Sequence, residues 1–137
     1  MEKVNCILLV DDNPGDNYFN KFIIFDSGIC DNIHIATTGM QALTYLRKST
    51  EEGQLESFPT PDIIFLDINM PRMNGFEFLE SYEKLSQKLK SKIKIVMLTT
   101  SLNPDDQKKE KSYPDVKEFR NKPLSIEMLH EIIERYF

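Results

Sequence analysis

The sequence contains few of the features that mark secreted, membrane-bound or nucleic-acid-binding proteins. Its two cysteines, Cys6 and Cys30, are too few for a disulfide framework. No apolar run approaches the roughly 18 residues of a membrane span, and Asp11 ends the first apolar run too early for a signal peptide. A net charge of -5 argues against a nucleic-acid surface, which needs basic patches. We therefore expect a cytoplasmic protein that binds neither nucleic acid nor membrane.

The composition is that of an ordinary globular protein, with 40% hydrophobic and 28% charged residues. A chain of 137 residues suits one domain, and it buries roughly two-thirds of the surface that its unfolded form exposes. We expect Cys6 to be a small buried side chain and Cys30 a reduced thiol in a loop. Because the last predicted helix ends at Phe137, we expect a single domain over residues 1–137 and no output domain.

Short apolar runs alternate with segments of helical periodicity along the chain. The runs predict five strands, at Cys6–Val10, Ile33–Ala36, Ile63–Leu66, Ile93–Leu98 and Val116–Phe119. The segments predict five helices, from Asn13-Pro14 to Gly28, at Gly39–Lys48, at Phe76–Leu89, at Pro104–Ser112 and at Ser125–Phe137. The first helix is expected to present an apolar face of Tyr18, Phe19, Phe22, Ile23 and Phe25. The fourth helix contains no apolar residue and is expected to be weak.

Five strands alternating with five helices predict an α/β fold with helices on both faces of a parallel sheet. The commonest topology for this count is flavodoxin-like, a doubly wound (βα)5 sheet with strand order 2-1-3-4-5. Ligands of such folds bind at the carboxyl ends of the strands where the winding reverses. The functional site is therefore expected beyond the first and third strands.

Polar residues follow the central strands at this predicted site. The first strand is followed by Asp11 and Asp12, the third by Asp67, the fourth by Thr99 and the fifth by Lys122. Each alone is explained by helix capping or loop polarity. Together they place three carboxylates, a hydroxyl and an amine at one edge of the sheet.

Three neighbouring carboxylates repel one another unless a cation binds between them. Mg²⁺ is the natural ion, because it prefers oxygen ligands and keeps phosphate oxygens in its shell. A carboxylate beside Mg²⁺ can attack a phosphoryl group, and Asp67 is the best placed because it ends a central strand. Lys122 would supply a second positive charge and Thr99 a hydrogen bond. Neither His34 nor His130 has the convergent partners of a metal site, so we expect both to be structural or surface residues.

The motifs Leu8–Asn13, Leu66–Gly75, Met97–Thr99 and Lys122-Pro123 resemble, in order, those of the response-regulator receiver family of two-component signalling. The resemblance covers essentially the whole chain and departs at no key position. It implies phosphoryl transfer from a phosphohistidine on a sensor histidine kinase, or on a histidine phosphotransfer protein, to Asp67.

The same resemblance implies the roles of the neighbouring residues. Asp12 and Asp67 would bind Mg²⁺ directly with the Asn69 carbonyl, and Asp11 would act mainly through a water. Thr99 corresponds to the family's switch hydroxyl and Phe119 to its switch aromatic residue. Within the family, the chain is most similar to small stand-alone regulators that accompany phytochrome-type kinases. These also have a long stretch before the third strand, here Ser49–Pro61, which is expected to be partner-facing or mobile.

Two other functions remain open at this point. A haloacid-dehalogenase-type phosphatase also uses an aspartate nucleophile and Mg²⁺. Its motif is Asp-x-Asp, with a second acid two residues after the nucleophile, and here that position is Asn69. A protein-interaction module on the same fold would not be phosphorylated at all. In the receiver interpretation, the signal leaves through a downstream protein, through onward phosphotransfer or through formation of a homodimer.

Overall fold

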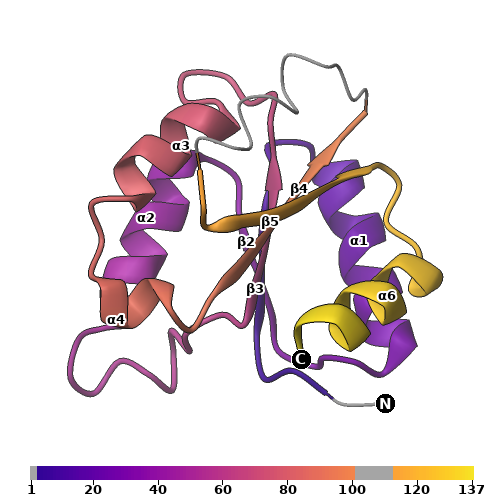
Figure 1. The fold of residues 1–137 in the computed structure, drawn as a ribbon, viewed down its shortest axis with the longest axis horizontal. Helices are drawn as coiled ribbons and strands as arrows, with labels where there is room; N and C mark the ends of the chain where they lie inside the picture. Colours follow the sequence, from indigo (N-terminus) through magenta and orange to yellow (C-terminus); the bar gives the residue numbers. More distant parts are fainter. Residues whose placement is uncertain (1–2, 101–112) are drawn as a thin grey trace.

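A five-stranded parallel sheet forms the centre of the molecule, with the strand order β2-β1-β3-β4-β5 (Figure 1). The computed structural model describes residues 3–100 and 113–137. The strands are β1 Ile7–Val10, β2 Ile33–Ala36, β3 Ile63–Asp67, β4 Lys94–Thr99 and β5 Val116–Asn121. The predicted flavodoxin-like order is confirmed. Three strands run further than predicted, and their last residues are Asp67, Thr99 and Asn121.

Helices cover both faces of the sheet, α1 and α6 on one and α2, α3 and α4 on the other (Figure 1). Their bounds are α1 Pro14–Ser27, α2 Gly39–Lys48, α3 Gly75–Tyr82, α4 Gln87–Lys90 and α6 Ile126–Tyr136. Each begins after a polar residue whose side chain accepts a hydrogen bond from the first turn, and these residues are Asn13, Thr38, Asn74, Ser86 and Ser125. The predicted fourth helix, Pro104–Ser112, lies outside the described residues.

Two apolar cores lie on the two faces of the sheet, because successive strand residues point to opposite sides. Leu8, Val10 and Ile64 pack with α2 and α3 in one core. Ile7 and Leu9 pack with α1 and α6 in the other. Every residue of β1 and β3 is buried, as expected of central strands covered on both faces.

The apolar face predicted for α1 does not pack against the sheet. Tyr18, Phe22 and Phe25 have 78%, 57% and 63% of their surface exposed, and Phe19 is also exposed. The buried residues of this helix are Asn17, Asn20 and Ile24. At 3.6 residues per turn the five predicted residues form one stripe, about 160° wide. This stripe faces solvent, and only Ile23 at its border packs against the core.

The predicted helix Phe76–Leu89 is wrong in its extent, because the chain forms two helices there. Helix α3 ends at Tyr82, and Ser86 has an extended backbone with ψ 143°. Its side chain accepts a hydrogen bond from the Leu89 N–H, which starts the four-residue α4. Leu85 and Leu89 still pack against the same core as α3, which explains the continuous apolar spacing.

Both cysteines are free and fully buried. Cys6 agrees with its prediction. Cys30 is a free thiol in the loop between α1 and β2, as predicted, and its side chain packs in the core between the sheet, α1 and α6. Burial raises the pKa of the Cys30 thiol, so the sulfur behaves as a small apolar group.

The segment Ser49–Pro61 is attached to α2 near its end. The Tyr45 hydroxyl donates to the Pro59 carbonyl at 2.6 Å, and the Phe58 ring lies 5.5 Å from the Tyr45 ring. Its role as a partner-facing or mobile feature stays a prediction. Among residues 3–100 and 113–137, no helix has the length and apolar character to cross a bilayer.

Candidate functional site

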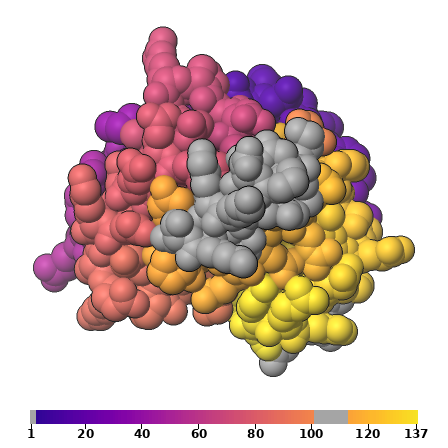
Figure 2. Space-filling model, turned by 45° about the horizontal axis from the view of Figure 1, so that its top comes forward, coloured from indigo at the N-terminus to yellow at the C-terminus, as the bar shows by residue number. Residues whose placement is uncertain are grey.

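The residues predicted from the strand ends do meet at the carboxyl-terminal edge of the sheet, which Figure 2 turns toward the viewer. Asp67 and Thr99 are the last residues of β3 and β4, and Asp11 directly follows β1. Lys122 follows β5, and its backbone N–H donates to the Thr99 carbonyl at 2.7 Å. The open pocket at this edge has a volume of about 330 Å³ and is lined by Asp11, Asp12, Asn13, Pro14, Asp16, Asp67, Asn69, Thr100 and Lys122.

Three carboxylates converge in this pocket. Oxygen atoms of Asp11, Asp12 and Asp67 all lie within 4.8 Å of one another. Asp11 and Asp67 are buried, whereas Asp12 is exposed. Such a group of like charges is stable only with compensating positive charge.

Lys122 provides positive charge from the protein itself. Its Nζ lies 2.6 Å from Asp11 Oδ2, 3.0 Å from Asp16 Oδ2 and 3.5 Å from Asp67 Oδ1. Burial by itself lowers the pKa of Lys122, but the hydrogen bonds to Asp11 and Asp16 outweigh burial and raise the pKa above its ordinary value. The lysine is therefore charged throughout the physiological range.

The Asp67 carboxyl lies in the least favourable environment for a negative charge. Burial raises the pKa of Asp67 to about 6, the Asp11 carboxylate raises it as well, and Lys122 opposes both. The Asn69 backbone N–H donates to Asp67 Oδ1 at 3.4 Å. At neutral pH Asp67 is thus mostly ionised, but its charge is incompletely stabilised by the protein alone.

Asp11 is held in place by the start of α1. Its Oδ1 accepts from the Asn13 N–H at 2.9 Å, and its carbonyl accepts from Asn17 Nδ2 at 2.8 Å. Neither Asn17 nor Asp16 was predicted as a site residue. Their spacing of four and five residues from Asp12 is a signal for this contact, because it places both on the helix turn that faces the strand end.

Thr99 is fully buried at the end of β4. Phe119, the predicted switch aromatic residue, is partly buried on β5, and its ring centroid lies 6.5 Å from that of Phe76. Phe76 in turn lies 6.0 Å from the Tyr113 ring. Thr99 and Phe119 lie on the neighbouring strands β4 and β5, and their switch roles stay a prediction.

Gly75 allows α3 to begin directly beneath the Asp67 backbone. A Cβ at this position would come within 2.7 Å of the Asp67 carbonyl oxygen and 3.0 Å of Ile68 Cα. The Gly75 N–H donates to the Ile68 carbonyl at 2.8 Å. The glycine is thus required by close packing rather than by backbone conformation.

The two histidines do not contribute to the pocket. His34 lies on β2, where its ring centroid is 5.2 Å from the Tyr45 ring. His130 lies on α6. Both positions agree with the prediction that they are structural or surface residues.

The donor set fits a hard divalent cation. Carboxylate oxygens, an open pocket with room for water and the absence of thiol or imidazole among its lining residues are the environment that Mg²⁺ prefers. Burial first, and then the Asp11 carboxylate, raise the pKa of Asp67, and a bound cation would offset this repulsion from Asp11.

Comparisons with known proteins agree on one family. Residues 7–134 match the model of the response regulator receiver domain. The Response regulator Rcp1 of Synechocystis sp. is 36% identical over 100 residues, which cover 73% of this chain and 65% of Rcp1. The structure of a two-component response regulator from Cytophaga hutchinsonii is similar, with a TM-score of 0.87 and 31% sequence identity. The match covers 97% of this chain and 96% of that chain. The structure of the bacteriophytochrome response regulator AtBRR has a TM-score of 0.73 and 29% sequence identity. The match covers 96% of this chain and 91% of that chain.

Proposed function

Because the chain belongs to the response regulator receiver family and acts in a two-component phosphorelay, we propose that Asp67 is the residue that accepts the phosphoryl group. The observation that carries this proposal is the convergence of Asp11, Asp12 and Asp67 within 4.8 Å beside Lys122. Receiver domains take their phosphoryl group from histidine kinases or histidine phosphotransfer proteins. The kinship with Rcp1 and AtBRR favours a kinase of the phytochrome type as the donor.

In the proposed reaction, a carboxylate oxygen of Asp67 attacks the phosphorus atom of a phosphohistidine. A new O–P bond forms as the N–P bond breaks, and the imidazole nitrogen keeps the electron pair. Asp67 is suited to this role because its carboxyl group is mostly ionised at neutral pH, while the protein stabilises the charge poorly before the reaction. Transfer places additional negative charge directly in front of Lys122.

Bound Mg²⁺ would neutralise phosphoryl oxygens and hold them in line for attack. Asp12, Asp67 and the Asn69 carbonyl would hold the ion directly, and Asp11 would act mainly through a water. Asp11 is already engaged by Lys122 and by the Asn13 N–H, which suits it to orient a water rather than to approach the ion closely.

Lys122 and Thr99 would recognise the product. Lys122 divides its contacts among three acids, so a phosphoryl group on Asp67 can draw it from Asp16, its more exposed partner. Thr99 would donate its hydroxyl to the phosphoryl group, and the space it leaves would let Phe119 turn inward. We propose that this change passes the signal to a downstream protein or supports onward phosphotransfer.

The protein would turn over no free substrate. A receiver domain is not a substrate-turnover enzyme of the ordinary kind. The chemistry proposed for this pocket is limited to its own phosphorylation and to hydrolysis of its own acyl phosphate. Asn69, where a phosphatase of the haloacid-dehalogenase type carries its second acid, agrees with this limit.

The acceptor assignment is tested by phosphoryl uptake. With acetyl phosphate and Mg²⁺, the intact protein is expected to gain the mass of one phosphoryl group, and hydroxylamine should remove it. Asp67→Asn should gain none, whereas Asp62→Asn, at the other end of β3, should be labelled like the parent. Equal labelling of Asp67→Asn would refute the assignment. Failure of the parent protein to take up phosphate would favour the protein-interaction module instead.

Magnesium binding is expected to depend on Asp12. Asp12→Ala removes an exposed acid that faces two buried ones, so the fold should survive or even gain stability while Mg²⁺ affinity is lost. Titration calorimetry with Mg²⁺ measures this. Asp26→Ala, which removes an exposed acid from the far end of α1, is the matched control and should bind Mg²⁺ normally. Undiminished affinity in Asp12→Ala would remove Asp12 from the set of direct ligands.

A further inference from the structure

The two edges of the sheet differ in their protection against pairing with another strand. Strand β5 carries Lys117, Glu118 and Arg120, and Glu118 bonds to Arg120, Arg135 and Tyr136. Strand β2 reads Ile-His-Ile-Ala and contains no lysine, arginine, aspartate, glutamate or proline. Charged residues and prolines are the usual means by which proteins prevent edge pairing. The residues of β2 itself include none of them.

The free part of the β2 edge is short and well defined. The carbonyls of Asn32 and Ala36 point toward β1, where they accept from Ile7 and Asp11. Because peptide groups alternate along a strand, those of Ile33 and Ile35 point outward. At the next outward position the Thr37 N–H is already bonded to Gln41 Oε1 at 2.8 Å. Unsatisfied edge groups are therefore expected at Ile33 and Ile35.

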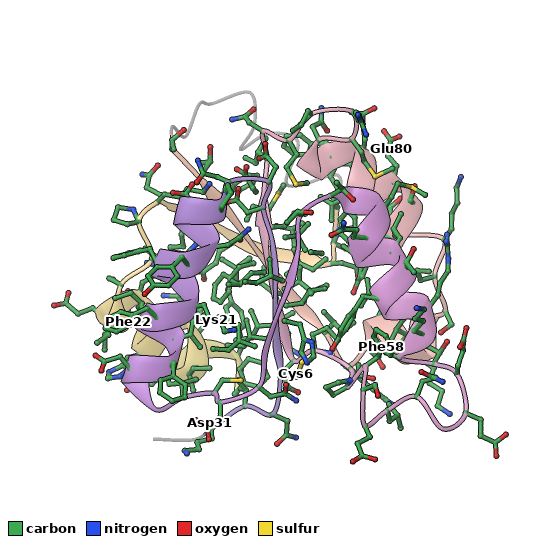
Figure 3. The ribbon with its side chains drawn as sticks, turned by 180° about the vertical axis from the view of Figure 1, so that it is seen from behind. Cys6, Lys21, Phe22, Asp31, Phe58 and Glu80 are labelled. Atoms are coloured by element: carbon green, nitrogen blue, oxygen red, sulfur yellow. The ribbon has the colours of Figure 1, made fainter. Side chains whose placement is uncertain are left out.

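Apolar surface lies on both sides of this edge. Figure 3 views β2 from outside, between α1 and α2, with Lys21 and Phe22 labelled on α1 and Phe58 toward α2. On the α1 side, Tyr18 and Phe25 are 78% and 63% accessible, and Ile35 on β2 itself is 40% accessible. On the α2 side, an apolar groove of about 310 Å³ is lined by Ile35, Ala36, Met40, Gln41, Thr44, Tyr45, Lys48 and Phe58.

We propose that the β2 edge binds a second copy of this chain, in an antiparallel pair of β2 strands related by a twofold axis at His34. In this register Ile33 of each copy lies opposite Ile35 of the other copy, which makes two such pairs. Each pair exchanges two backbone hydrogen bonds. The resulting four hydrogen bonds satisfy the outward N–H and C=O groups of Ile33 and Ile35 on both copies. The two sheets join into one, with the α1 helices on one face and the α2 helices on the other.

Charge complementarity favours a second copy over an unrelated strand. The register that pairs Ile33 with Ile35 also sets Asp31 opposite Thr37 of the other copy, beside the amino terminus of its α2. Helix α2 has no acidic residue in its first turn, so a carboxylate from the other copy would interact favourably with its positive end. Asp31 has only a 3.8 Å contact with Lys3, and both side chains are more than 60% exposed. Each copy therefore offers the charge that the other lacks.

The apolar area is close to what a specific dimer needs. With about 150–250 Å² for each large side chain, the exposed fractions of Tyr18, Phe25, Ile35 and Met40 amount to roughly 900 Å² over two copies. Polar and backbone surface of the same edge adds to this value. Specific interfaces generally exceed about 1,000 Å² in total. In the antiparallel arrangement Tyr18 faces Phe25 of the other α1, and Lys21 between them can extend its amine to solvent.

Sedimentation analysis over a concentration series tests the dimer. The parent protein is expected to dimerise, and Ile35→Lys, which places a charge on the edge, should remain monomeric at the same concentrations. Leu55→Lys is the matched control, since Leu55 is 59% exposed in the segment between α2 and β3 and should leave the dimer unchanged. Circular dichroism checks that each variant is folded. A parent protein that stays monomeric, or a dimer that persists in Ile35→Lys, would overturn the proposal.

The register is tested separately with His34→Cys. Residues at the axis of an antiparallel pair have Cα atoms about 4.5 Å apart, which lies within the range of a disulfide. Mild oxidation of this variant is therefore expected to give a covalent dimer, whereas Leu55→Cys should not crosslink under the same conditions. Buried Cys6 and Cys30 provide the background, measured in the parent protein. Crosslinking no faster than that of Leu55→Cys would refute the pairing through His34.

Discussion

Replacing Lys122 with methionine is expected to lower the free energy of unfolding of the metal-free protein by about 3 kcal/mol at pH 8. Lys122 is the cation that faces Asp11 and Asp67, whose side chains are only 6% and 8% exposed. Removing one partner of a buried ion pair leaves uncompensated charge, which costs about 3–5 kcal/mol. Partial protonation of Asp67 reduces this cost. Because the pKa of Lys122 is raised, its contribution is fully present below pH 10 and is lost only in strong alkali.

Urea unfolding in a chelating buffer measures this loss. The matched control is Lys117→Met on β5, the strand that Lys122 follows, where the lysine is exposed and the change should be within about 0.5 kcal/mol. Mg²⁺ should restore much of the stability of Lys122→Met, because the cation replaces the missing positive charge. Equal losses in the two variants would show that Lys122 does not stabilise the acidic pocket.

Asp67→Asn is expected to stabilise the metal-free protein at pH 8 by as much as 3 kcal/mol. Burial first, and then the Asp11 carboxylate, raise the pKa of Asp67 from 3.8 to about 6 in the folded protein. That difference corresponds to about 3 kcal/mol of unfavourable interaction when Asp67 is charged. Asparagine keeps nearly the same shape without the charge. The variant should therefore be more stable wherever Asp67 is ionised.

The difference in stability between Asp67→Asn and the parent protein is expected to depend on pH. A carboxyl group with a raised pKa favours the folded state below its unfolded pKa, and this advantage is lost as pH rises through the folded value. The difference between Asp67→Asn and the parent should therefore grow between pH 4 and pH 7 and then level off. Asp62→Asn should not gain stability at pH 8, because the Asp62 carboxylate accepts from the backbone N–H groups of Asn5 and Cys6. A pH-independent difference for Asp67→Asn would contradict the electrostatic explanation.

The site could be predicted from the sequence because it depends on topology rather than on detailed packing. Parallel strands with buried faces are continuous apolar runs, so the ends of β1, β3 and β4 could be located to within one residue. Once the strand order is known, the residues that follow those ends must meet. Asp11, Asp67, Thr99 and Lys122 were found in this way.

The orientation of α1 could not be predicted in the same way. Apolar side chains usually face the core, but four of the five residues in the apolar face predicted for α1 are exposed. These four are Tyr18, Phe19, Phe22 and Phe25. Two buried residues of the helix are asparagines, and Asn17 is turned inward by a hydrogen bond to the Asp11 carbonyl. A polar contact with the site, together with Ile24, thus determines the helix orientation. Hydrophobic periodicity contains no information about such a contact.

The attachment of Asp11 to the start of α1 makes the acidic pocket and the first helical turn one thermodynamic unit. The Asp11 carboxylate accepts from the Asn13 N–H, while the Asn13 side chain accepts from the Asp16 N–H and the Asp16 carboxylate bonds to Lys122. Because Lys122 also bonds to Asp11, these contacts form a closed ring that connects the end of β1, the cap of α1 and Lys122. A change of charge at any member shifts the folding equilibrium of the turn, so fraying of α1 is coupled to the occupancy of the pocket.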